Sequence, residues 1–364
     1  MPMISSGPPV PAAVRAANPL DADYRRLLDL CPVLRVRLLA DDEPAPSRLQ
    51  GWYSAAELAG DPEALADSLA GEAARIAPVA AGYGTSPRPH VVASRLLHHY
   101  LWSVSVLIAG PWYLARRVPL IGGADLWMHA ATGDLALRPR AHVTLAGEDE
   151  LRAELRAAVV THVEPLLTAF AAPARRGTRA LWGMVTDDLA SAIWYLGRML
   201  DATHPAGEAG EAGEAGASAA ARAAATVEAV LGGAVHGPAE LRAVFTEPAG
   251  ARSGAAGGEG ESCAAAGAAT RALRAEEAAR PGPSEAAPHP ATHEAAAVAA
   301  AGAVLPGHTE PLPGAADFRL LRGEDGRAHH TRTRLGCCLY YAIQPGNACL
   351  TCPRTADEER LRRL

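Results

Sequence analysis

Four cysteines near the C-terminal end constrain this chain more than any other feature of its sequence. Cys337 and Cys338 are adjacent, ten residues separate Cys338 from Cys349, and two residues separate Cys349 from Cys352. Four thiolates are the ligand set of a [2Fe–2S] cluster, two for each iron. The Cys349-x-x-Cys352 spacing directs two sulfurs at one metal, and residues 345–347 (Pro-Gly-Asn) predict a turn that returns this pair toward the first. The sequence therefore predicts a metal centre built on these four thiols.

A structural zinc site is the main alternative for the same residues, because four-cysteine zinc sites also contain C-x-x-C pairs. Such sites usually combine two of these pairs, and the adjacent Cys337-Cys338 is a poor substitute for one. Disulfides are less favoured, since nothing in the sequence marks the chain as secreted. A redox pair formed by Cys349 and Cys352 alone would rest on a weak signal. The cluster is the favoured interpretation.

The cysteine block resembles the signature of the FhuF-like family of ferric-siderophore reductases. Its CC-x10-C-x2-C spacing, followed by Pro353, differs from the spacings of plant-type and bacterial ferredoxins. Two further stretches resemble the same family in the same order: residues 93–102, which lead to Gly110-Pro111, and residues 181–190, which contain Trp-Gly. The resemblance covers residues 50–200 loosely and residues 317–354 closely.

This resemblance implies a cytoplasmic [2Fe–2S] protein that passes one electron to a ferric siderophore, with hydroxamates favoured. It implies that Cys337, Cys338, Cys349 and Cys352 hold the cluster and that no separate catalytic acid or base is required. The chain has no G-x-G-x-x-G after a strand, so an external electron donor such as a ferredoxin or flavin reductase is expected. Two other functions stay open: a redox-inert siderophore- or metal-binding protein with a four-cysteine zinc site, and an iron–sulfur electron-transfer accessory protein.

Arginines surround the cysteine block. Arg332, Arg334 and Arg354 are expected to favour the reduced state, because an all-thiolate cluster is anionic and becomes more so when it gains an electron. An ordinary solvated face is an equal alternative for these side chains. One-electron chemistry suits a ferric siderophore, whose hard oxygen donors bind the larger and less charged Fe(II) ion less tightly than Fe(III).

Two histidine pairs invite a metal-ligand interpretation. His98 and His99 point about 100° apart on a helix, with no histidine or acid four residues beyond either, so packing is expected. His329-His330 lies close to the block in sequence. A Rieske arrangement needs histidines in place of two cysteines, and four cysteines are already available. Electrostatic tuning is therefore the expected role of this second pair.

Composition excludes several classes of function. The net charge of −6 argues against nucleic acid as the main partner. Every basic residue is arginine, so a Schiff-base lysine and a P-loop lysine are excluded. The first residues lack the features of a signal peptide, and the apolar stretch 96–115 is interrupted by Gly110-Pro111. A buried helix and a cytoplasmic location are expected, with no transmembrane segment and with peripheral membrane association left open.

The expected fold is α+β and predominantly α-helical, with small β-hairpins. Four parts are expected: a flexible N-terminus (1–20), a mainly helical siderophore-binding body (21–200), an Ala/Gly/Pro-rich insertion with short helices (201–316), and the cluster-binding segment (317–364). The N-terminal helices are expected to form a ligand cleft, to which the C-terminal hairpin presents the cluster.

Caps, prolines and alternation predict the individual elements. The expected elements are helices at 21–30, 62–76, 89–109, 148–171, 178–200, 217–231 and 239–245, a strand at 34–38, hairpins at 126–137 and 317–335, and a short helix begun by a capping box at 355–358.

Overall fold

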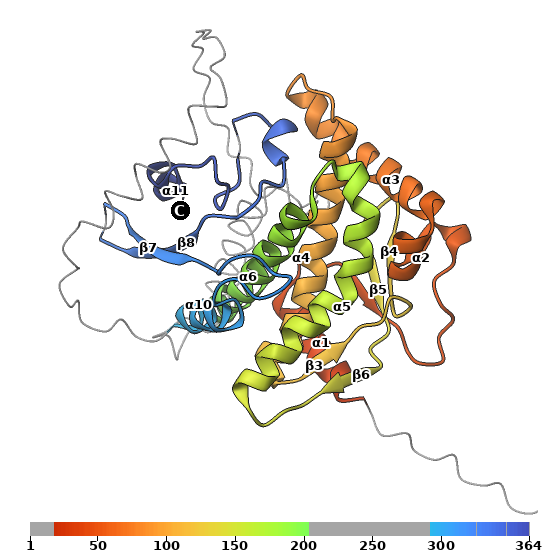
Figure 1. The fold of residues 1–364 in the computed structure, drawn as a ribbon, viewed down its shortest axis with the longest axis horizontal. Helices are drawn as coiled ribbons and strands as arrows, with labels where there is room; N and C mark the ends of the chain where they lie inside the picture. The colour runs from red at the N-terminus through yellow and green to blue at the C-terminus, as the bar shows by residue number, and fades with distance from the viewer. Residues whose placement is uncertain (1–17, 204–291, 325, 347, 364) are drawn as a thin grey trace, which may run out of the picture. The chain divides into compact units, whose positions relative to one another are not determined.

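A computed structural model of the chain describes residues 18–203, 292–324, 326–346 and 348–363. All of them belong to one compact unit. The fold is α+β and predominantly helical, as expected (Figure 1). The helices expected at 217–231 and 239–245 and most of the flexible N-terminus lie outside the described residues.

A long buried helix, α4 (Pro89–Ala115), occupies the centre of the fold between α5 (Glu148–Ala174) and α6 (Thr178–Thr203) (Figure 1). The sequence predicted its end at Ala109, but it continues through Pro111. Proline cannot donate a hydrogen bond to the carbonyl four residues earlier. The Tyr24 hydroxyl donates to that carbonyl of Leu107 instead, at 3.1 Å, so the helix continues without an unpaired buried acceptor.

Within the described residues, three further α-helices precede α4. They are α1 (Pro19–Leu30), α2 (Ala55–Gly60) and α3 (Pro62–Gly82). The side chain of Asn18 caps α1 by accepting from the Leu20 amide, so the expected cap, Asp21, lies inside the first turn. Asp61 caps α3 as predicted. That helix passes through Pro78, where the sequence predicted its end.

Two small sheets pack beside these helices. The four-stranded sheet has the order β1 (Val36–Leu38), β5 (Leu135–Leu137), β4 (Leu126–His129), β2 (Trp52–Ser54). Its β4–β5 pair is the predicted hairpin. A two-stranded sheet joins β3 (Val118–Leu120) to β6 (Ala141–Val143).

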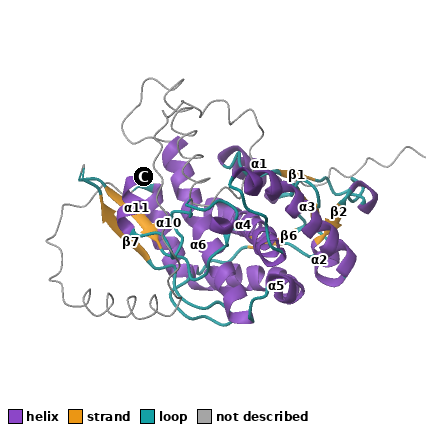
Figure 2. Cartoon of the chain, turned by 90° about the horizontal axis from the view of Figure 1, so that it is seen from above, coloured by secondary structure: helices purple, strands orange, loops and turns teal. Residues whose placement is uncertain are grey.

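The chain after residue 291 packs against α6. Its elements are α10 (His293–Val304), β7 (Phe318–Arg322), β8 (Ala328–Arg332), the 3₁₀ helix η2 (Tyr340–Ala342) and α11 (Asp357–Arg362). The β7–β8 hairpin confirms the prediction. Figure 2 shows α6 between α10 and α4.

Helix α10 was not predicted, because its alanine-rich sequence continues the composition of the insertion. It buries Ala297, Ala301 and Val304 against the core. Gly197 of α6 makes the close approach possible: a Cβ there would lie 2.4 Å from the Cβ of Ala297. Small side chains on both helices therefore bury this segment where larger ones could not fit.

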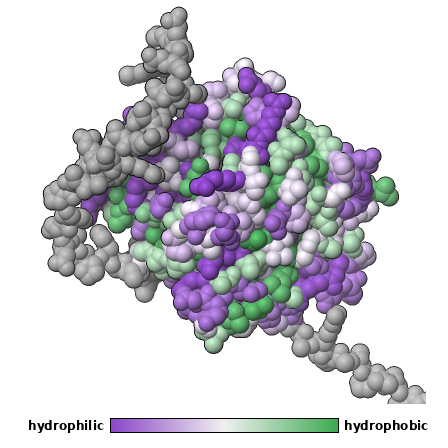
Figure 3. Space-filling model, viewed as in Figure 1, coloured by the Kyte–Doolittle hydropathy of each residue, from purple (hydrophilic) through white to green (hydrophobic). Residues whose placement is uncertain are grey.

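Helices α4 and α5 are long and apolar enough to cross a membrane by length and composition. The apolar window of α4 is 94% buried in the protein, which agrees with the predicted buried helix, although the helix is longer than predicted. Buried core helices commonly have the same length and apolar composition, so these two features are weak support for a membrane span. On the face drawn in Figure 3, hydrophilic and hydrophobic residues are interspersed.

Candidate metal centre

The four predicted cysteines lie together in the structure. Cys338, Cys349 and Cys352 are buried and form one cluster of side chains, against which the partly exposed Cys337 packs. All four are free thiols. Cys337 interacts with Cys352, and Cys338 with Cys349, so the C-x-x-C pair does lie against the vicinal pair.

Hydrogen-bond donors face these sulfurs. Leu339, in the left-handed conformation (φ 63°), donates its amide to the Cys337 sulfur at 3.4 Å. Interaction with Cys352 is the main cause that lowers the pKa of Cys337, and this amide adds to it against the effect of burial. The Cys349 thiol and burial raise the pKa of Cys338 to about 12. The left-handed conformation of Leu339, next to the vicinal cysteines, costs roughly 1–2 kcal/mol in a residue other than glycine.

The C-x-x-C turn is fixed by hydrogen bonds from α11 and from the residues just before that helix. Buried Arg360 donates to the carbonyls of Leu350 (2.6 Å) and Cys352 (2.9 Å). The Thr355 hydroxyl donates to the Cys349 carbonyl at 3.0 Å. The predicted capping box is therefore wrong: Ala356 occupies the N-cap without a side-chain bond, because the Thr355 hydroxyl binds the cysteine turn.

Two adjacent acids on α6 bind the segment that precedes the vicinal pair. Asp187 accepts from the amides of Leu335 and Gly336, both at 2.9 Å, and from the Arg332 guanidinium at 2.7 Å. Asp188 accepts from Arg334 at 2.8 Å. Both carboxylates are fully buried. The Trp-Gly stretch of α6 thus meets the cysteine block through carboxylates that sequence reasoning did not single out.

His98 joins this network from α4. Its Nδ1 lies 3.0 Å from an oxygen of Asp188, and both ring nitrogens lie 3.3 Å from the guanidinium of Arg334. Burial raises the pKa of Asp188, but the charges of Arg334 and His98 outweigh it and hold that pKa below its usual range. The expectation of simple packing for His98 is therefore corrected: it is buried, and it is a polar partner of the segment before the cysteines.

The arginines differ from their expected arrangement. Arg332 and Arg334 are buried and paired with the α6 carboxylates, which contradicts a solvated face. Arg354 is exposed and lies over the Tyr341 ring, 4.2 Å from its centroid. Arg176, which sequence reasoning missed, donates to the Cys337 carbonyl at 2.5 Å. Desolvation lowers the Arg176 pKa, against an opposing effect of the Cys337 and Cys338 charges.

The second histidine pair lies on β8. His330 is 3.9 Å from Glu294 of α10. Burial raises the pKa of Glu294, but the bond from His330 and the charge of Arg198 hold it below its ordinary value. His330 thus pairs with an acid on α10, and its tuning of a cluster stays a prediction.

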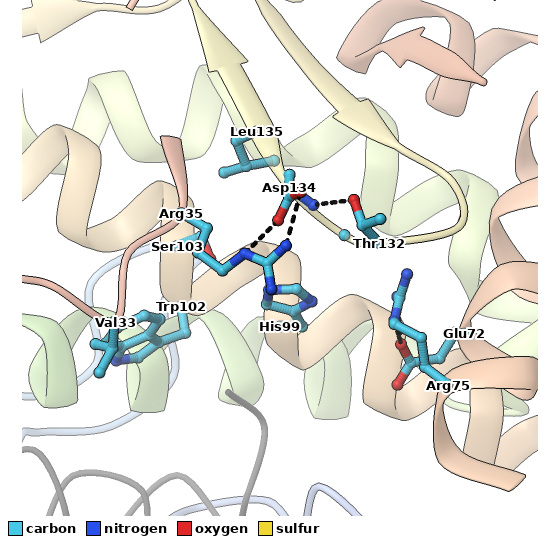
Figure 4. Close-up of a pocket in the computed structure, with 11 residues that line it drawn as sticks. Val33, Arg35, Glu72, Arg75, His99, Trp102, Ser103, Thr132, Asp134 and Leu135 are labelled. Carbon is cyan, nitrogen blue, oxygen red and sulfur yellow. Dashed lines mark hydrogen bonds and ion pairs between the residues drawn. The ribbon is translucent and has the colours of Figure 1, made fainter. Parts of the chain in front are cut away.

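His99 lines a pocket instead (Figure 4). The pocket is an open hollow of about 460 Å³, part of which is open solvent. Two ion pairs border it: Arg35 with Asp134, at 2.8 Å, and Arg75 with Glu72. Burial lowers the pKa of His99 to about 4, with smaller contributions from nearby charges. The pocket belongs to the N-terminal helices and the β4–β5 turn, and His99 is neutral at pH 7.

The cysteine site fits a [2Fe–2S] cluster by its donor chemistry. Four free thiols converge, the number that two tetrahedral irons require beyond their bridging sulfides. An amide already donates to one sulfur, as hydrogen bonds do in tuned iron–sulfur sites. The positive charge of Arg95 acts on the Cys338 thiol, and that of Arg334 acts on the Cys349 thiol. This arrangement suits an anionic centre.

Comparisons with known proteins agree with the cofactor. Residues 334–354 match the family described as the FhuF 2Fe-2S C-terminal domain, and this match assigns a [2Fe–2S] cluster to the chain. A search of curated proteins and a search of solved structures each found no match. The resemblance inferred from the cysteine spacing is therefore confirmed over the C-terminal segment.

Proposed function

We propose that this chain, whose C-terminal segment is of the FhuF type, is a ferric-siderophore reductase with a [2Fe–2S] cluster ligated by Cys337, Cys338, Cys349 and Cys352. The observation that carries the proposal is the convergence of four free thiols, held in place by the buried carboxylates of α6. A bound [2Fe–2S] cluster supplies one electron at a time.

The reaction balances with a single electron. Fe(III) in the siderophore gains it and becomes Fe(II), whose lower charge weakens its bonds to the hard oxygen donors, so the ion can leave. An external one-electron donor, such as a ferredoxin or a flavin reductase, then replaces the electron. No proton has to move, which agrees with the absence of a predicted acid–base pair. The chain's residues have three tasks: to bind the cluster, to exclude water from it and to let the siderophore approach.

Cys337 is the proposed side of approach. It is the one partly exposed thiol of the four, and Leu335 beside it exposes 47% of its surface. The other three thiols are buried, and Tyr340 and Ala348 pack against them. A ferric siderophore that reaches the Cys337 edge therefore has the shortest path for an electron from the buried centre.

Hydroxamates are the proposed substrate class. Catecholate groups carry more negative charge than hydroxamates, stabilise Fe(III) more strongly over Fe(II) and so are harder to reduce. We further propose a cytoplasmic location, because thiols must stay reduced until a cluster is loaded. Peripheral membrane association is compatible with this reading.

The test begins with protein purified without oxygen. We expect two irons and two acid-labile sulfides per chain and a visible spectrum that bleaches on reduction. Reduced protein, freed of excess reductant, is then mixed with a ferric hydroxamate and an Fe(II) chelator. One Fe(II) per reduced chain is the expected yield, with Cys349→Ser protein as the control that releases none.

Two results would overturn the proposal in different ways. A colourless protein with one zinc would leave a redox-inert siderophore- or metal-binding protein. A reducible cluster that releases no Fe(II) from hydroxamates or catecholates would indicate an electron-transfer accessory protein.

A further inference from the structure

Arg95 of α4 is a buried cation with unpaired donors. Only 3% of its surface is exposed, and its Nε and Nη1 have no hydrogen-bond partner in the part of the chain that the structure describes. Among the described residues, no carboxylate forms an ion pair with it. Its guanidinium lies over the Tyr340 ring, 4.9 Å from the centroid.

The other buried arginines near the cysteines each have a carboxylate partner, although the Nε of Arg334 also lacks a hydrogen bond within the described residues. Arg332 and Arg334 pair with Asp187 and Asp188, and Arg360 donates to two carbonyls and to Asp357. Burying a guanidinium whose donors are unpaired lowers the free energy of unfolding by roughly several kcal/mol. Buried charges therefore almost always have an anionic or carbonyl partner. Arg95 is the exception that calls for one.

The place of Arg95 indicates what this partner is. Tyr340, on which the guanidinium stacks, follows the vicinal pair by two residues. The charge of Arg95 also acts on the Cys338 thiol. Tyr340 packs against the cluster of Cys338, Cys349 and Cys352, so the guanidinium stacked on its ring is next to a side chain that contacts the thiols.

We propose that Arg95 binds the anionic [2Fe–2S] centre at its Cys338 side, donating hydrogen bonds from Nε and Nη1 and raising its reduction potential. This inference rests on the cluster of the proposed function, not on the siderophore. The charges of Arg332 and Arg334 are balanced by two buried carboxylates, so Arg95 is a source of uncompensated positive charge on the buried side. Its attraction grows when the centre gains an electron, which favours the reduced state.

The test is a redox titration of cluster-loaded protein in the absence of siderophore. We expect Arg95→Gln to lower the midpoint potential by at least a tenfold change in the reduction equilibrium, about 59 mV for one electron. Arg95→Lys keeps the positive charge but loses the planar guanidinium, and we expect its midpoint potential to lie between those of the wild-type and Arg95→Gln proteins. Arg354→Gln is the matched control: it removes an exposed arginine close to Cys352 in sequence, whose charge water screens.

The outcomes separate this inference from the proposed function. A fully loaded Arg95→Gln protein with the wild-type potential would overturn the role of Arg95 while leaving the reductase intact. If Arg95→Gln does not accumulate a cluster, Arg95→Lys decides: a wild-type potential there overturns the guanidinium contact, and a lowered one supports it. Failure to release iron from siderophores would leave the potentials, and hence this inference, unaffected.

Discussion

Two neighbouring histidines on α4 face different environments. His98 is fully buried, and its ring contacts Asp188 and Arg334, which come from other parts of the chain. His99 is half-buried and faces a pocket with one partly exposed ion pair, Arg35 with Asp134, and one largely buried pair, Arg75 with Glu72. Charges on the first side are dehydrated and position the cysteine segment, whereas on the second side the Arg35–Asp134 pair is open to water. Helix α4 thus separates a buried charge network, where a substitution should lower stability strongly, from a pocket rim, where a substitution should lower it less.

The largest expected difference concerns the cofactor itself. Cys349→Ser removes the thiol that interacts with both Cys338 and Cys352, so we expect complete loss of the visible iron–sulfur spectrum. His99→Gln, on the pocket side of α4, should keep the full spectrum and the full iron and sulfide content. Equal cluster loss in both proteins would show that the two sides of α4 are not independent.

The next effect concerns the buried network. Asp188→Asn leaves Arg334 without the charge that faces it at 2.8 Å, and removing one partner of a buried ion pair typically costs about 3–5 kcal/mol. Chemical denaturation should show a loss of this size in the free energy of unfolding.

Asp149→Asn is the matched control for this change. Its side chain is 95% exposed and pairs with Arg152 on the same helix, so we expect a loss below about 1 kcal/mol. An Asp188→Asn protein as stable as this control would contradict the view that dehydrated charge holds the C-terminal segment.

The sequence predicts most of the helices and the site itself, because both depend on local patterns. Asp61 before Pro62 marks the start of α3, and the spacing of the cysteines specifies the thiol cluster and its turn. The predicted helix ends before Pro78 and Pro111 were wrong, because both helices continue through the proline. At Pro111 a contact with a distant segment explains the continuation. The carbonyl that proline leaves unpaired there receives the hydroxyl of Tyr24, more than eighty residues earlier.

The support around the site could not be predicted in the same way. Asp187 and Asp188 are 145 and 146 residues from the arginines that neutralise them, and nothing local distinguishes them from solvent-exposed helix acids. Arg95 likewise stands in an apolar helix without a recognisable partner. The buried position of α10 depends on Gly197 of another helix. These features are set by packing between distant segments, which a single sequence does not display.

A pH dependence should distinguish the two sides of α4 further. The folded-state pKa of His99 lies near 4, below the unfolded value near 6.5, so the unfolded state binds a proton first as the pH falls. Stability from this residue is fully present above pH 6.5 and is lost as the pH falls toward 4. Between pH 6.5 and 5, the expected loss in unfolding free energy is roughly 2 kcal/mol.

The difference between wild-type protein and His99→Gln isolates this contribution, because the other titrating groups are common to both. The variant should lose less stability over the same pH interval by about that amount, as measured by denaturant titration at each pH. Parallel stability curves for the two proteins would show that the pocket-side imidazole is solvated in the folded state.

The smallest effect should come from the ion pair at the pocket rim. The Arg35 and Asp134 side chains expose 45% and 30% of their surface, so water screens their attraction and competes for their hydrogen bonds. A double-mutant cycle with Arg35→Gln and Asp134→Asn should give a coupling of about 0.2–1 kcal/mol, decreasing as salt is added. The corresponding cycle with Arg334→Gln and Asp188→Asn should give a coupling several times larger and nearly independent of salt. Equal couplings at the two sites would remove the distinction between a dehydrated face and a hydrated face of α4.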